Sequence, residues 1–139
     1  MKKVVYGLLT VAMVFLLTGC GKTTLTCKLT QQNVDLDYVM VFKGNVIKTM
    51  SLQYVINLSG KTDAEIQAAN KQDYCSLIKS SMSQYKEGFE NCNQKVDGSK
   101  IIVYTDINPN KITNNVFDKM GSIEETKTEL EKIGYSCSY

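Results

Sequence analysis

The chain has 139 residues, with 16 basic residues, all of them lysine, against 14 acidic residues. A chain of this length suits one domain with a core of its own. Histidine is absent, which excludes a Ser-His-Asp triad, a Cys-His dyad and the usual imidazole metal ligands.

The first 20 residues have the order of an export signal. Lys2 and Lys3 precede an apolar run over residues 4–17, which fits a secretory signal and is shorter than the roughly 20 apolar residues of a membrane-spanning helix. Leu17-Thr18-Gly19-Cys20 follows and resembles the lipobox of bacterial lipoproteins. The alternative is an uncleaved N-terminal anchor helix that ends in a cysteine. The resemblance implies that residues 1–19 are a cleaved signal peptide and that Cys20 carries a diacylglyceryl lipid. The protein would then be anchored to the cell membrane on its extracytoplasmic face.

Cleavage there leaves a single domain of residues 20–139, or 139 − 19 = 120 residues. Loss of Lys2 and Lys3 leaves 14 lysines and 14 acidic residues, so this domain is close to neutral. A neutral domain does not favour a nucleic-acid or anionic-lipid surface. We therefore expect no nucleic-acid partner and attachment to the membrane through the lipid.

Apolar and polar residues alternate in the first half of the domain, which predicts strands. A β-prone run over residues 24–29 is followed by two long alternating runs, residues 34–42 and 46–58, joined by a Lys43-Gly44-Asn45 turn. Each long run has one apolar face. This pattern predicts an antiparallel sheet covered on one side.

The second half adds helices and further strands. A capping box, Thr62 with Glu65, begins a predicted helix over residues 62–86, with a buried stripe of Ile66, Ala69, Tyr74, Leu77, Ile78, Met82 and Tyr85. Strands are predicted at residues 89–96 and 100–107 around an Asp97-Gly98 turn. Residues 111–120 are ambiguous. A second capping box at Ser122 starts a short helix that carries Ile123, Leu130 and Ile133 inward, and a short strand over 135–139 ends the chain. The prediction is an α+β domain: an antiparallel sheet with one long and one short helix packed on its apolar face.

Five cysteines occur: Cys20, Cys27, Cys75, Cys92 and Cys137. If Cys20 is lipidated, four remain, and disulfides are the default for a small exported domain. Their spacings lack the clustering of a zinc site, and no C-x-x-C redox motif is present. Four cysteines allow three pairings. The positions on the predicted elements favour Cys75–Cys92, from helix to next strand, and Cys27–Cys137, from first to last strand.

The order of these elements resembles the YehR-like bacterial lipoproteins, a family of unknown function. The stretches that carry the resemblance are Val41-Phe42-Lys43-Gly44-Asn45-Val46-Ile47 and Leu130-Glu131-Lys132-Ile133-Gly134-Tyr135. The four cysteines depart from what we associate with that family as a whole. Because its function is unknown, the resemblance implies no functional residues.

No catalytic constellation stands out, so we expect a non-enzymatic lipoprotein without cofactor or metal. Its partner would be a small ligand or an envelope protein, and the eight tyrosines offer contacts with an apolar body and a polar tip. One alternative is an envelope hydrolase that uses two carboxylates, for which Asp35, Asp37 and Asp106 are the candidates. Another is an accessory subunit of a membrane complex.

Overall fold

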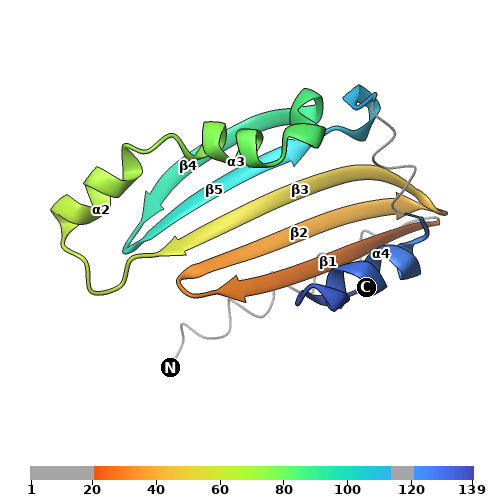
Figure 1. The fold of residues 1–139 in the computed structure, drawn as a ribbon, viewed down its shortest axis with the longest axis horizontal. Coiled ribbons are helices and arrows are strands. Elements are labelled where there is room, and N and C mark those ends of the chain that lie inside the picture. Colours follow the sequence, from red (N-terminus) through yellow and green to blue (C-terminus); the bar gives the residue numbers. More distant parts are fainter. Residues whose placement is uncertain (1–20, 114–120) are drawn as a thin grey trace, which may run out of the picture.

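Six strands form one antiparallel sheet in the computed structural model, which describes residues 21–113 and 121–139. Cys20 and the predicted signal peptide lie outside the described residues. The strand order is β4-β5-β3-β2-β1-β6 (Figure 1), and each neighbouring pair is antiparallel. The strands are β1 (Lys22–Gln31), β2 (Val34–Lys43), β3 (Val46–Asn57), β4 (Phe89–Asp97), β5 (Lys100–Ile107) and β6 (Ser136–Ser138). The predicted antiparallel α+β architecture is confirmed.

One face of the sheet carries the core. Successive strand side chains point to opposite faces, so the alternating runs place their apolar residues together. The fully buried side chains come from four neighbouring strands and are Leu25, Cys27, Met40, Phe42, Leu52, Ile101, Val103, Thr105 and Ile107. The β2–β3 turn uses Gly44 at φ +61°, a conformation that glycine adopts without steric cost.

Three short segments occupy the place of the predicted long helix, so that part of the fold prediction is wrong. They are α2 (Asp63–Asn70), α3 (Tyr74–Ser81) and the 3₁₀ helix η2 (Ser83–Gly88). The capping box at Thr62 starts α2 as predicted. Asp73 then caps a new helix: its carboxylate accepts hydrogen bonds from the Ser76 backbone N–H at 3.0 Å and from the Ser76 hydroxyl at 2.7 Å. An aspartate that bonds three residues ahead is a strong N-cap, so one helix ends and another begins.

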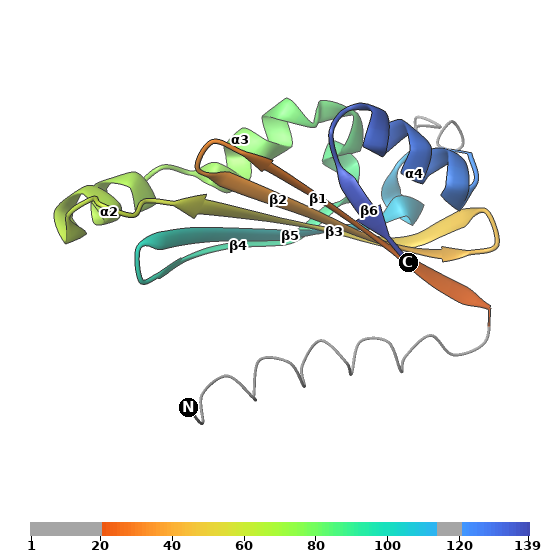
Figure 2. The same ribbon diagram turned by 90° about the horizontal axis from the view of Figure 1, so that it is seen from below.

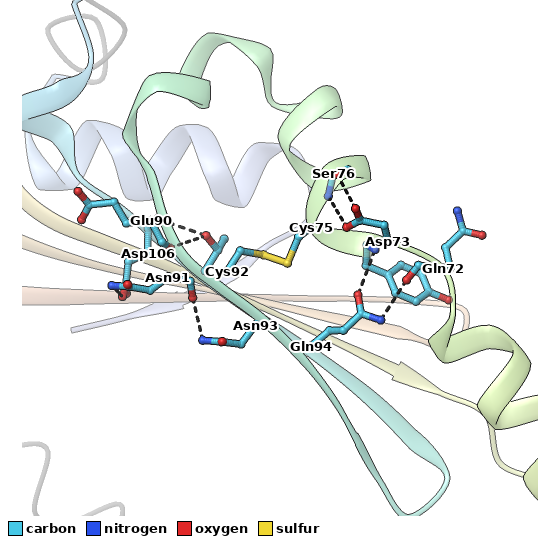
Figure 3. Close-up of a disulfide and its surroundings, with 12 residues drawn as sticks. Gln72, Asp73, Cys75, Ser76, Glu90, Asn91, Cys92, Asn93, Gln94 and Asp106 are labelled. Carbon is cyan, nitrogen blue, oxygen red and sulfur yellow. Dashed lines mark hydrogen bonds between the residues drawn. A yellow bond between two sulfur atoms is a disulfide. The ribbon is translucent and has the colours of Figure 1, made fainter.

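Gln94 of β4 fixes this break (Figure 3). Its Oε1 accepts from the backbone N–H of Tyr74 at 3.2 Å, and its Nε2 donates to the carbonyl oxygens of Asn70 at 2.8 Å and Gln72 at 3.0 Å. Helix ends leave such backbone groups without intrahelical partners. One side-chain amide therefore forms hydrogen bonds with backbone groups at both the end of α2 and the start of α3.

The helices divide between the end and one side of the sheet. α3 and α4 (Ile123–Lys132) stand on the same side (Figure 2), whereas α2 lies beyond one end of the strands (Figure 1). Ile78 of α3 packs with Ile101 and Val103 of β5, and Leu130 of α4 packs on the main core.

Two residues predicted to face inward are exposed instead. Leu77 is 49% exposed and Ile133 is 68% exposed. Leu77 belongs to a helix that starts afresh at Asp73, so the stripe drawn for one continuous helix loses its phase there. Ile133 is the C-cap of α4 and lies past its last turn.

The remaining four cysteines lie in the two pairs that the sequence predicts. Cys27 and Cys137 are directly opposite each other on β1 and β6, with a sulfur–sulfur distance of 2.04 Å. Cys75 of α3 and Cys92 of β4 are joined at 2.05 Å (Figure 3). The first pair ties the last strand to the sheet edge, and the second ties α3 to the opposite edge strand.

Candidate functional site

A cleft of about 430 Å³ opens between the two helical parts on the core side of the sheet. Tyr38 and Met40 of β2 and Met50 of β3 line it from the sheet. From the helical layer it is lined by Leu130 of α4 and by residues 81–85, where α3 passes into η2. The cleft exists because α3–η2 and α4 cover different strands and leave the middle of the sheet between them.

Two tyrosines, Tyr38 and Tyr85, line this cleft, and Tyr54 and Tyr135 lie near Tyr38. The rings of Tyr38 and Tyr135 meet edge to face, with centroids 5.4 Å apart, an arrangement that aromatic pairs prefer. Burial raises the pKa of Tyr38, and the nearby Tyr135, Tyr54 and Tyr85 raise it further. Burial is also the main reason that the pKa values of Tyr54, Tyr85 and Tyr135 are raised. All four hydroxyls therefore stay neutral at physiological pH.

The described residues that line the cleft carry no charged side chain. They combine tyrosine rings and methionine thioethers with the hydroxyl groups of Ser81 and Ser83 and the amide of Gln84. Methionine adapts its shape to irregular partners and makes favourable contacts with aromatic rings. Such a surface can hold an uncharged molecule that is apolar on one side and hydrogen-bonding on another.

The three predicted carboxylates lie elsewhere, on the opposite face of the sheet, and they do not converge. Asp35 and Asp37 lie in β2, whereas Asp106 lies two strands away in β5. At about 4.8 Å per strand, the Cα atoms of Asp37 and Asp106 are separated by roughly 10 Å or more. Asp35 accepts a hydrogen bond from the Thr30 hydroxyl at 2.7 Å. The three aspartates therefore do not share one site, although Asp35 and Asp37, two residues apart on one face of β2, have Cα atoms roughly 7 Å apart.

Within residues 21–113 and 121–139, no group of three or more His, Cys, Asp or Glu side chains is arranged to hold a metal ion. In the same part of the chain, no helix combines the length and the apolar character that crossing a membrane would need.

The sequence places Met82 and Tyr85 in a buried stripe, and both do pack against core residues. It does not reveal that they border a cleft, because the cleft lies between α3–η2 and α4 and the placement of these two parts has no local signal. The sequence prediction also missed the break between α2 and α3. The signal that could have shown the break is Asp73 with Ser76 three residues later, an N-cap pattern inside the predicted helix. The partner that completes the break, Gln94, comes from a distant strand and has no local signal.

Comparison with known proteins gives a fold and no function. No family model matches the chain. No curated protein matches it either. Among solved structures, the NMR structure of a protein from Streptococcus pneumoniae TIGR4 is similar, with a TM-score of 0.55 and 10% sequence identity over 86% of this chain and 87% of that chain. At this identity the similarity shows the shared fold alone.

Proposed function

We propose that this protein is a membrane-anchored, non-enzymatic binding protein whose cleft holds a small, uncharged, partly apolar ligand. The observation that carries the proposal is the cleft itself, lined by tyrosines, methionines and neutral polar groups. Its volume lies within the roughly 300–1,000 Å³ range of small-molecule sites.

The chemistry of the lining supports an uncharged ligand. A charged ligand would lose its hydration in the cleft without meeting an opposite charge from the lining side chains, and burial of an unpaired charge is costly. An apolar ring or chain would instead contact Tyr38, Met40 and Met50 from below. Hydroxyl and amide groups of residues 81–85 would orient its polar end. The proposal requires that α3–η2 and α4 stay packed on the apolar face of the sheet.

Methionine methyl groups provide a direct test. In the described ranges the methionines are Met40, Met50 and Met82, and all three line the cleft. With ¹³C-labelled methionine methyl groups in the chain from Gly21 to Tyr139, neutral aromatic fragments are titrated and NMR spectra recorded. We expect some fragments to shift all three resonances together, because the three side chains border one space.

Two tryptophan variants show whether the cleft is the site. Ser83→Trp places a large ring at the cleft lining and should abolish the shifts, whereas Ser80→Trp changes an exposed residue of α3 outside the lining and should leave them. Thermal unfolding confirms that both variants fold. The proposal fails if no fragment shifts these methyl groups, or if Ser83→Trp binds fragments as well as the parent protein does.

The membrane anchor is a separate part of the proposal and rests on the residues of the lipobox, Leu17 to Cys20. We propose that Cys20 is lipidated and that the domain lies on the extracytoplasmic face, as in the YehR-like lipoproteins that the chain resembles. Replacement of Cys20 with Ala should leave an unprocessed precursor or release the protein from membranes. Membrane fractionation and mass spectrometry of the N-terminus test this, and normal processing of the variant would contradict it.

A further inference from the structure

A second concave site lies on the face of the sheet opposite to α3 and α4. This open-face hollow has a volume of about 540 Å³ and is bounded by the 3₁₀ helix η3 (Pro109–Lys111). Ser51 of β3, Asp106 of β5 and Glu90 of β4 occupy one row across its floor, each directly opposite the next. Tyr104, which is 37% exposed, lies beside this row.

A β-bulge follows Glu90 directly, beside this hollow. The register of β4 and β5 shifts between Glu90 and Asn93, and Asn91 has a left-handed φ of +51°. Bulges often occur next to functional sites, where they turn a side chain in a new direction. Here the amide Nδ2 of Asn91 donates to Oδ2 of Asp106 at 3.3 Å (Figure 3).

Two links outside the hollow hold the bulge in place. Cys92, inside the bulge, is bonded to Cys75 of α3. The buried Thr105 hydroxyl donates to the carbonyl oxygen of Glu90 at 3.0 Å. The bulge is therefore fixed from the core side, and this fixes the Asn91 amide that bonds to Asp106.

Asp106 is held as a fixed hydrogen-bond acceptor. Its Oδ1 accepts from the Tyr104 hydroxyl at 2.6 Å and its Oδ2 from Asn91. Each carboxylate oxygen can accept two hydrogen bonds. The carboxylate can therefore accept further bonds from the two hydroxyl groups of a diol.

The charges around the hollow balance. Glu90 pairs with Lys111 and accepts from the Asn108 amide, and Lys48 lines the hollow together with Asp106. With Lys111 included, two lysines offset the two carboxylates, and these donors and acceptors lie near the ring of Tyr104 and the ring of Pro109. This combination of polar groups and ring faces is complementary to a pyranose, which has hydroxyl groups around its edge and C–H groups on its faces.

We propose that the open-face hollow binds a neutral saccharide unit, with Asp106 accepting hydrogen bonds from its hydroxyls and Tyr104 contacting its C–H face. The proposal is for binding without cleavage, in keeping with the non-enzymatic function proposed above. The hydrogen bond from Lys111 holds the pKa of Glu90 below its ordinary value of 4.5, so Glu90 carries the negative charge that Lys111 balances. This site is independent of the cleft and of its proposed ligand.

Calorimetry with the full chain in a detergent without sugar groups tests the proposal. The probes are chitotetraose, maltotetraose and cellotetraose, titrated to millimolar concentration. We expect at least one of them to bind. Asp106→Asn and Tyr104→Ala should each weaken its binding about tenfold or more, since each removes a contact with the sugar, in one case a hydrogen bond to a charged group.

Asp35→Asn is the matched control, because Asp35 also accepts a hydroxyl hydrogen bond but lies outside the hollow. It should bind the sugar like the parent protein. Lys48→Ala, at an exposed lining residue, provides a second variant if Tyr104→Ala does not fold, and it should also bind more weakly. The proposal is overturned if none of the three sugars binds, if the Asp106 and Lys48 variants bind as tightly as the parent, or if mass spectrometry finds shortened sugars.

Discussion

Removal of the two disulfides should destabilise the domain unequally. We consider two double variants, Cys27→Ala with Cys137→Ala, and Cys75→Ala with Cys92→Ala. The bonded cysteines are separated by 110 residues in the first pair and by 17 in the second. Both pairs join elements that stay in place through other contacts, so the folded state can survive either loss.

The size of each effect follows from the chain entropy of the unfolded state. In the loop-closure model, the shorter loop contributes about 3 kcal/mol and the longer one about 5 kcal/mol. For the 139 − 19 = 120 residues that follow the proposed signal peptide, an unfolding entropy near 2.1 cal/mol/K per residue converts these values into Tm decreases of about 12 °C and about 20 °C. Cys27 is fully buried, so its truncation also leaves a small cavity, which increases the difference.

Urea and thermal unfolding under non-reducing conditions measure both variants against the parent protein. The parent measured with a reducing agent is the control, and it should be less stable than either double variant. An equal loss in the two variants, or a larger loss for the Cys75–Cys92 pair, would refute the entropic argument. Peptide mapping without reduction checks the pairing itself, and a Cys27–Cys75 or Cys27–Cys92 peptide would contradict the structure.

Three further predictions concern packing and protonation. Gly88→Ala should lower the free energy of unfolding in urea by about 1–3 kcal/mol, because the new Cβ would lie 2.8 Å from the carbonyl oxygen of Asn108. A variant as stable as the parent would show that η3 can shift freely. Burial raises the pKa of Tyr38, so the unfolded state releases this proton first, and stability should decrease as pH rises above the ordinary tyrosine value of 10.0. Tyr38→Phe should show a smaller decrease, and an identical stability–pH profile for parent and variant would count against the burial. The backbone N–H of Ser76 lowers the pKa of Asp73 below 3.8, so this N-cap stabilises the fold above that pH, and the stabilisation is lost as pH falls. Asp73→Ala should lower Tm at neutral pH but not once the parent's carboxylate is protonated. A difference in Tm that does not depend on pH would contradict the role of Asp73 as an ionised N-cap.

Much of the sheet could be predicted from local patterns. The apolar alternation in β2 and β3 and the glycine turns at Gly44 and Gly98 fix which residues share a face and where the chain reverses. The elements they predict match the strands within one or two residues. The disulfide pairing was also predicted, because local geometry favoured Cys75 on the helix with Cys92 on the next strand, which left Cys27 with Cys137.

The helical layer could not be predicted to the same depth, because its breaks depend on tertiary contacts. Local helical propensity runs through Lys71 and Gln72, and the interruption is stabilised by Gln94, more than 20 residues away. The cleft depends on how far apart α3–η2 and α4 pack on the sheet, and that spacing has no local signal in the sequence. The open-face hollow depends on a bulge at Asn91, whose partner Asp106 lies on the neighbouring strand. Of the carboxylates named from the sequence, Asp106 lines the open-face hollow.

The Cys27–Cys137 bond also determines what a protease can release. Nearly the whole domain lies inside one covalent loop, because the bonded residues are separated by 110 positions. A single cut between them opens the loop, but both fragments stay joined through the disulfide. Cys27 lies only 27 − 20 = 7 positions after Cys20, so with a lipid at Cys20 the cut protein would also stay at the membrane. A single cut could shed the domain only in that short segment, and most of the segment is already part of β1.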